Sequence, residues 1–417
     1  MNYKERRHKL MEQLPEHSLT LLYAGGDVLR SADACFRFES NRNFYYLCGI
    51  EEQDAILALY KTPNKIEETL FIRDLNYDLE KWTGRYIRPE EAKAISEIED
   101  VRFLSGFDTY FNYLRSRCGV NCFGLDGEHD PNGRHLFEGE EQAALLRQRY
   151  PMAEFVDVYP LICSMRLVKS PEEIELIRQA IAITDEALDN VLAHIGPEQY
   201  EYDFVAEFKY ILNKYNATEM FETICASGEN ACVLHYISNA DVAHDGELCL
   251  FDLGAKKDSY GADISRTYPV SGRYSPRQRQ IYDIVLEGQD LIFSLARPGV
   301  TLRELNRALI DFYAKKLQEI GLIEKAEEVS KYYYHGVSHM FGLDTHDVGS
   351  MEWIKLEAGH VISNEPGLYI AEEGIGIRIE NDLLITEDGC EDLCKDVKRL
   401  PEDIEAYIAA HNPRFQK

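Results

Sequence analysis

Five residues in the last two fifths of the chain are of types that bind metal ions, and each lies in its own short motif. Four are carboxylates and one is an imidazole, a hard-ligand set with enough negative charge for two divalent cations. Two adjacent cations are a common device for hydrolysis, because they hold both the attacking and the leaving oxygens. The five residues are Asp252, Asp263, His339, Glu365 and Glu380.

The two aspartates are separated by ten residues that include Gly261. Two strands joined by such a connection form a hairpin, in which both carboxylates can face the same side. Asp252 lies in the apolar run Leu-Cys-Leu-Phe-Asp-Leu, and a buried unpaired carboxylate is costly. A salt bridge or a turn cap would also explain either aspartate taken alone.

Three histidines lie within twelve residues, His335, His339 and His346, in a chain that has only 12. The first two are four apart, as in the zinc-binding His-Glu-x-x-His helix, but Gly336 stands where that motif has its general base. Glycine and β-branched neighbours favour strand or loop here. An isolated histidine is more often a hydrogen-bonded core residue, whereas this density favours a site.

The two glutamates have different settings. Glu365 precedes Pro366-Gly367, a turn that would hold its carboxylate at the end of a strand, although a solvated turn glutamate is the alternative. Arg378 and Glu380 alternate with isoleucines and share one face, so a structural ion pair between them is also open. The glycines near Glu380 do not form a dinucleotide-binding Gly-x-Gly-x-x-Gly motif, because Ile379 occupies the place of the third glycine. The sequence also lacks the Gly-x-Ser-x-Gly motif of a serine nucleophile, and no Cys–His pair lies in a recognisable catalytic motif.

Predicted strands position these residues. The apolar patterns predict strands at 248–253, 264–270, 360–362, 368–370 and 374–385, and each candidate ligand falls on or beside one of them. Helices are predicted from Ser170-Pro171 to Gly196, from Ser275-Pro276 to about residue 296, and from Thr301 to about residue 321. Glu173 and Glu304 complete capping boxes with Ser170 and Thr301.

The first 160 residues alternate strand-like and helix-like segments without a chemical motif of their own. Strands are predicted at 19–23, 55–60 and 69–72, and a helix at 141–147. The clearest boundary is the segment 165–173, so we expect an amino-terminal α/β domain over 1–165 and a second domain over 166–417.

Composition limits the partners. The 417 residues carry a formal net charge of −28, which argues against nucleic acid or an anionic membrane as partner. The first residues lack the apolar core of a signal peptide, and there is no run of 18 apolar residues. Ten scattered cysteines without a Cys-x-x-Cys pair are typical of reduced thiols, so we expect a cytoplasmic protein.

Taken together and in order, the five motifs closely resemble those of the pita-bread metallopeptidases, and best those of the Xaa-Pro aminopeptidase (aminopeptidase P) family, over essentially the whole chain. The resemblance implies an α/β fold with an amino-terminal creatinase-like domain and a carboxy-terminal pita-bread domain. It also implies two metal ions, usually manganese, with cobalt, zinc or iron as alternatives. Asp252 would bind one metal, Asp263 and Glu380 would bridge both, and His339 and Glu365 would complete the other.

The resemblance assigns further residues. Glu365, His346 and His235 would be catalytic, with the two histidines near the scissile bond and the tetrahedral intermediate. His335 would line the proline subsite, and Tyr369 and Arg378 would support the ligand network. Trp82 is similar in setting to a tryptophan that reaches the active site of a neighbouring subunit, although a structural tryptophan explains it nearly as well.

The implied activity is removal of the N-terminal residue from peptides with proline in second position. Two alternatives remain from the sequence: a prolidase, which cleaves only Xaa-Pro dipeptides, and a metal-free pita-bread protein that binds peptides without hydrolysis. The family also implies a homo-oligomer, a dimer or tetramer, with the amino-terminal domain serving oligomerisation and substrate access.

Overall fold

The computed structural model describes residues 1–130, 132–349 and 351–416. The chain forms two compact units, Met1–Arg166 and Leu167–Lys417. Both units mix helices and strands, as the sequence predicts. None of the helices in the described ranges combines the length and the hydrophobicity that a membrane crossing requires.

The first unit is built on a six-stranded sheet with the order β6-β5-β4-β1-β7-β8. Strand β4 pairs antiparallel with β1 and β5, whereas the β1–β7, β7–β8 and β5–β6 pairs are parallel. The three predicted strands correspond to β1, β4 and β5, and the predicted helix lies inside α6. The sheet strands are β1 (Ser18–Tyr23), β4 (Ile56–Lys61), β5 (Ile66–Ile72), β6 (Asp100–Phe103), β7 (Cys122–Leu125) and β8 (Glu154–Asp157). The helices are α1 (Tyr3–Glu12), α2 (Arg42–Cys48), α3 (Tyr77–Thr83), α4 (Pro89–Ser96), α5 (Phe107–Arg117), α6 (Glu138–Arg149) and α7 (Tyr159–Leu167). A short hairpin, β2 (Leu29–Ser31) and β3 (Ala34–Cys35), completes the unit.

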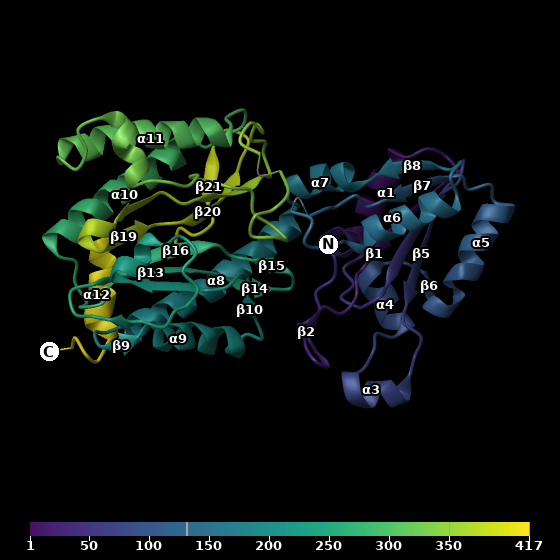
Figure 1. The fold of residues 1–417 in the computed structure, drawn as a ribbon, viewed down its shortest axis with the longest axis horizontal. Coiled ribbons are helices and arrows are strands. Elements are labelled where there is room, and N and C mark those ends of the chain that lie inside the picture. Colours follow the sequence, from purple (N-terminus) through teal and green to yellow (C-terminus); the bar gives the residue numbers. More distant parts are fainter. Residues whose placement is uncertain (131, 350, 417) are drawn as a thin grey trace. The chain divides into compact units, whose positions relative to one another are not determined.

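The helices of the second unit begin where the capping residues predict. Ser170 and Glu173 form the capping box of α8 (Pro171–His194), and Thr301 and Glu304 form that of α11 (Leu302–Glu319). Ser275 caps α10 (Pro276–Leu295). The other helices are α9 (Glu201–Lys214) and α12 (Pro401–His411). Helices α8 and α9 pack together, as do α10 and α11, and Figure 1 shows the strands between these two pairs.

The strands of the second unit form several small sheets. The orders are β11-β13-β16, β17-β20-β21, β10-β14-β15, β18-β19 and β12-β9. Their bounds are β9 (Gln199–Tyr200), β10 (Thr218–Glu219), β11 (Ile224–Ser227), β12 (Val242–Ala243), β13 (Leu248–Leu253), β14 (Ala255–Lys257), β15 (Tyr260–Gly261), β16 (Ile264–Pro269), β17 (Val361–Asn364), β18 (Gly367–Ile370), β19 (Ile375–Arg378), β20 (Asn381–Ile385) and β21 (Cys390–Asp392).

The prediction of one continuous strand over 374–385 is wrong. The strand is interrupted at Ile379 and Glu380, so that β19 pairs with β18 and β20 pairs with β17. At the interruption the Glu380 N–H donates to the carbonyl of Ser265 at 3.0 Å, instead of to a ladder partner. The alternating apolar pattern continues through the break and therefore does not reveal it.

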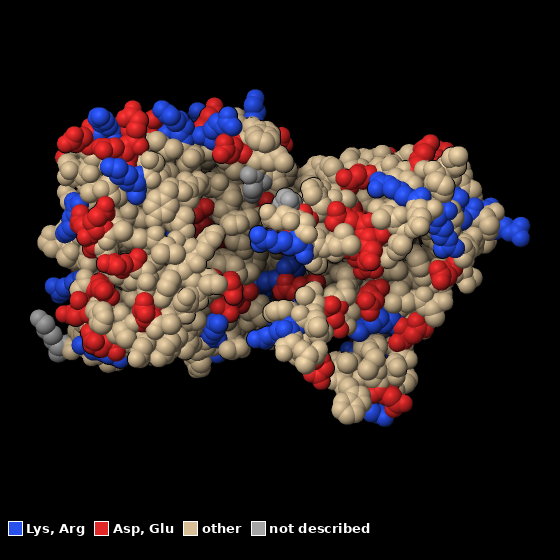
Figure 2. Space-filling view, in the orientation of Figure 1, with Lys and Arg blue, Asp and Glu red and all other residues tan. Residues whose placement is uncertain are grey.

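Surface charge on the second unit is mixed in places despite the large negative total. Figure 2 shows Lys and Arg side chains next to Asp and Glu over α11, where Arg307–Asp311 and Lys315–Glu319 are pairs four residues apart. Such exposed pairs contribute little to stability.

Candidate metal centre

A cavity of about 720 Å³ in the second unit brings together most of the predicted site residues. Those that line it are His235, Asp252, Asp263, His335, His339, His346, Glu365, Arg378 and Glu380. Tyr369 is buried next to the cavity, with its hydroxyl 2.8 Å from His335 Nε2. Trp82 is not among the lining residues; it belongs to α3 of the first unit, and 88% of its surface is exposed.

The two aspartates come from an antiparallel strand pair, as predicted. Asp252 faces Ser265 in the β13–β16 register, and Asp263 immediately precedes β16. The connection also contains β14 and β15, which the hairpin prediction did not include. At the base of the pair a Cβ on Gly254 would lie 1.7 Å from the carbonyl oxygen of Ala262, so only glycine permits this approach.

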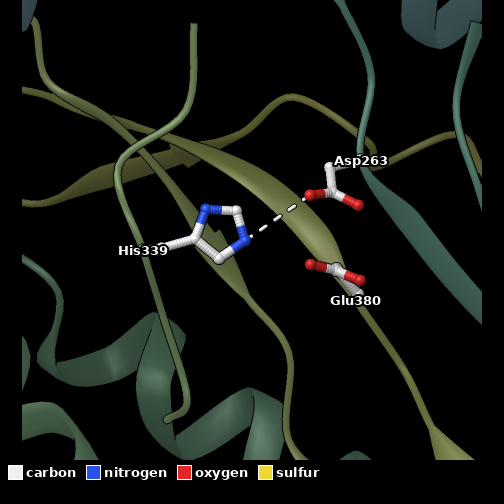
Figure 3. A group of neighbouring side chains, drawn as sticks. All are labelled: Asp263, His339 and Glu380. Carbon is white, nitrogen blue, oxygen red and sulfur yellow. Dashed lines mark ion pairs between the residues drawn. The ribbon is translucent and has the colours of Figure 1, made fainter. Parts of the chain in front are cut away.

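Asp263, His339 and Glu380 converge on one point. One ligand atom from each lies within 4.8 Å of the others, and Figure 3 shows the three side chains directed toward one another. His339 Nε2 is 3.5 Å from Asp263 Oδ2 and 3.5 Å from Glu365 Oε1. Its Nδ1 lies 3.0 Å from the carbonyl of Met340, which requires the proton on Nδ1 and leaves Nε2 for a ligand.

The segment that carries His339 is irregular, in agreement with the sequence. It adjoins β17, because the His339 N–H donates to Ser363 Oγ at 2.9 Å. Burial disfavours the protonated ring, but Asp263 and Glu365 outweigh it and raise the pKa of His339 to about 9. A cation held between these groups would take the place of that proton.

Glu365 lies in the link between β17 and β18, where its N–H donates to the carbonyl of Val337 at 3.0 Å. Ser363 Oγ donates to Glu365 Oε1 at 3.3 Å. The carboxylate is partly buried, which argues against a solvated turn glutamate. Burial raises its pKa to about 7, although His339 acts in the opposite direction.

Arg378 pairs with Asp252, so the ion pair with Glu380 that the sequence left open is absent from the described contacts. Its Nη2 donates to Asp252 Oδ2 at 2.6 Å, and its Nη1 donates to the Tyr369 hydroxyl at 3.0 Å. Among the described residues, Ser265 links Arg378 to Glu380, because its hydroxyl accepts from Arg378 Nε at 2.7 Å and donates to Glu380 Oε2 at 2.6 Å. Arg378 therefore fixes one wall of the carboxylate cluster.

The donor set fits divalent metal ions. Asp252 Oδ1 is buried and has no hydrogen-bond partner among the described residues. Burial, followed by repulsion from Asp263 and other carboxylates, raises the pKa of Glu380 well above its usual range. Burial likewise raises the pKa of Asp252. A buried carboxylate oxygen without a hydrogen-bond partner and an excess of like charge are both relieved by bound cations.

The three remaining histidines occupy different parts of the cavity lining. His335 is enclosed by the rings of Tyr333 and Tyr369, and burial, aided by Arg378, lowers its pKa to about 4. The ring of His346 stands edge-on to that of His339, with centroids 4.5 Å apart, and burial lowers its pKa. His235 is exposed and lines the cavity from the segment after β11.

Sequence reasoning missed several supporting residues. Asp382 is fully buried, and its Oδ2 accepts from the Asp263 N–H at 3.1 Å. Ser265 and Ser363 orient Glu380, His339 and Glu365 through the hydrogen bonds given above. Asp382 could have been noticed in the sequence as an acidic residue inside the apolar strand β20. Nothing in the sequence distinguishes Ser265 and Ser363 from other serines.

This fold and site agree with the comparisons to known proteins. Residues 175–387 match metallopeptidase family M24, and residues 3–121 match the domain described as aminopeptidase P, N-terminal domain. The chain belongs to metallopeptidase family M24 and has the two-domain pita-bread architecture, so it is a metal-dependent hydrolase.

Individual relatives resemble the chain along nearly its whole length. The Xaa-Pro aminopeptidase of Escherichia coli K12 is 34% identical over 438 residues, which cover 98% of this chain and 97% of that protein. A solved structure from Bacillus anthracis is 43% identical with a TM-score of 0.96, covering 99% of this chain and 98% of that one. The zinc-substituted aminopeptidase P of E. coli in complex with product is 32% identical with a TM-score of 0.89, covering 99% and 98%.

Proposed function

We propose that the protein is an Xaa-Pro aminopeptidase, which removes the N-terminal residue from peptides with proline in second position. The observation that carries the proposal is the cluster of four carboxylates and one imidazole in a peptide-sized cavity of about 720 Å³. Relatives named Xaa-Pro aminopeptidase match 97% or more of this chain at 34% and 32% identity. They favour this activity over a prolidase or a metal-free binding protein.

The proposed cofactor is a pair of divalent ions, most simply manganese. Asp252, Asp263, His339, Glu365 and Glu380 would hold them, in the roles that the sequence resemblance implies. Divalent cations bound there would supply Lewis-acid chemistry, which lowers the pKa of water and polarises a peptide carbonyl. A carboxylate-rich set suits manganese, whereas affinity order favours zinc, so metal availability decides the occupant.

Glu365 is the proposed proton shuttle. Its carboxylate lines the cavity 3.5 Å from His339 Nε2, and a carboxylate at that place can take a proton from the attacking water and deliver it to the leaving imide nitrogen of proline. His335 Nδ1 lies 3.8 Å from Glu365 Oε2, so the shuttle is also adjacent to the aromatic part of the cavity.

The histidines would serve binding and charge stabilisation. His346, kept neutral by burial, can donate a ring N–H to the oxygen that becomes negative at the tetrahedral stage. His235, exposed on the cavity lining, is placed to contact the substrate backbone. His335 lies among aromatic rings, with Tyr369 and Arg378 behind it, and this apolar slot suits the ring of a proline.

The deciding test is metal-dependent hydrolysis of a peptide series that contains Xaa-Pro dipeptides and Xaa-Pro-Xaa tripeptides. We expect release of the first residue from tripeptides after manganese is added to chelator-treated protein. Cleavage of dipeptides alone would identify a prolidase. Absence of both hydrolysis and bound divalent metal would support the binding protein instead.

We also propose a cytoplasmic homo-oligomer, a dimer or tetramer, in which the unit Met1–Arg166 serves oligomerisation and substrate access. The support is the large exposed apolar surface of α3, where Trp82 is 88% and Tyr77 is 66% exposed. A neighbouring copy could cover these rings, and light scattering of the purified protein tests the state.

A further inference from the structure

Part of the cavity lining is made by residues that the proposed mechanism does not use. The segments 221–224 and 234–237 contribute the apolar side chains of Phe221, Ile224, Leu234 and Ile237. Glu222 is the one acidic residue of these two segments that lines the cavity. An apolar surface that contains a single acid is a place for a long side chain with a cationic end.

Backbone hydrogen bonds hold this part of the lining in place. The Met220 N–H donates to the carbonyl of Gly254 at 2.8 Å, immediately before Phe221. Asn239 fixes the other end, because its Nδ2 donates to the carbonyl of Thr223 at 2.8 Å and its Oδ1 accepts from the Cys225 N–H at 2.7 Å. Glu222 therefore belongs to an anchored segment of the cavity lining.

The charge of Glu222 is uncompensated among the described contacts. The side chain is exposed and forms no ion pair with any described lysine, arginine or histidine. Glu219, three residues earlier, differs: its carboxylate lies 3.0 Å from Lys209 Nζ. Glu222 thus leaves one negative charge available to a ligand in the cavity.

We propose that Glu222 makes the subsite for the N-terminal residue selective for arginine and lysine. This inference rests on the proposed aminopeptidase function. The aliphatic stem of such a residue would lie along Ile224, Leu234 and Ile237, and its charged head would meet the Glu222 carboxylate. A neutral side chain of equal length would gain the apolar contact without the charge pairing.

The test measures kcat/KM with manganese-loaded full-length protein on Arg-Pro-Pro, Lys-Pro-Pro, norleucine-Pro-Pro and Glu-Pro-Pro. Norleucine supplies the apolar stem without charge. The ratio of Arg-Pro-Pro to norleucine-Pro-Pro should fall about fivefold in Glu222→Gln, as expected for a solvent-accessible ion pair. Glu222→Lys should shift the preference toward Glu-Pro-Pro. The matched control is Glu387→Gln, another exposed glutamate outside the cavity, which should leave the ratio unchanged.

Two results would overturn the inference: an unchanged ratio of Arg-Pro-Pro to norleucine-Pro-Pro in Glu222→Gln, or an equal loss for all four peptides. An equal loss would mean that the carboxylate binds the common free amine. Failure of the proposed function is distinguishable, because the unaltered protein would then hydrolyse none of the four tripeptides.

Discussion

The buried ion pair between Lys169 and Asp347 gives the sharpest test of how the cavity is held. Lys169 Nζ lies 3.0 Å from Asp347 Oδ2, and each side chain is only 1% exposed. Asp347 directly follows His346, and its N–H donates to the carbonyl of Met340 at 2.9 Å. A Cβ on Gly342 would lie 2.2 Å from Asp347 Oδ2, so the loop closes tightly over the pair.

Lys169→Met keeps most of the side-chain volume and removes the charge. The change breaks a buried ion pair from one side, which typically costs about 3–5 kcal/mol. For a folding unit of this size each kcal/mol lowers the Tm by roughly 2–4 °C, so we expect a decrease of about 10 °C. Because His346 directly precedes Asp347 in the chain, kcat should fall as well.

The assay is thermal unfolding followed by circular dichroism at one scan rate, with kcat measured on a tripeptide. Lys169→Met/Asp347→Asn, which removes both charges, should recover most of the lost Tm. Lys315→Met removes an exposed pair at 3.9 Å and should change the Tm by less than about 2 °C. A single variant as stable as the unaltered protein, or a double variant as unstable as the single one, would refute the reasoning.

Three further predictions concern other parts of the chain. Glu365→Gln should reduce kcat by at least about 10²-fold in tripeptide assays with little change in the circular dichroism spectrum, because it removes the proton shuttle; near-normal turnover would contradict that role. Burial and Asp189 raise the pKa of Asp185 to about 6, so the folded state binds this proton more tightly and loses stability as pH rises from about 4 to 6. Asp185→Asn should therefore be more stable by about 1 kcal/mol at pH 8, after allowance for partial exposure, and equal at pH 4 in urea unfolding; a gain at pH 4 would be inconsistent with this. Trp82→Ser should lower the oligomer mass in light scattering if a neighbouring copy covers the ring, and an unchanged mass and kcat would exclude that contact.

Local chemistry explains what could be read directly from the sequence. Ser170 and Glu173 lie three residues apart, so their reciprocal hydrogen bonds and the helix start they define follow from the sequence. The apolar runs located β1, β4, β5 and β13, because a short strand with buried residues on both faces is a continuous apolar run in the sequence. The two-domain fold and the metallopeptidase family came from the motifs in their order.

Partners distant in the chain could not be read in the same way. The sequence suggested an ion pair between Arg378 and Glu380, which are two residues apart. In the structure Arg378 pairs instead with Asp252, 126 positions earlier in the chain. The break between β19 and β20 at Glu380 involves a hydrogen bond to the carbonyl of Ser265. Asp382 supports the site by accepting a hydrogen bond from the Asp263 N–H. These contacts join different strands, so they exist only once the strands have packed.

The sequence by itself determined which residues could form a metal centre: four carboxylates and an imidazole, each in a motif of its own. Only the tertiary structure decided that Asp263, His339 and Glu380 meet within 4.8 Å, and that Glu222 shares their cavity without a cation of its own. The physical reason is that ligand type is a property of single residues, whereas burial, charge compensation and pKa depend on what the folded chain brings next to them.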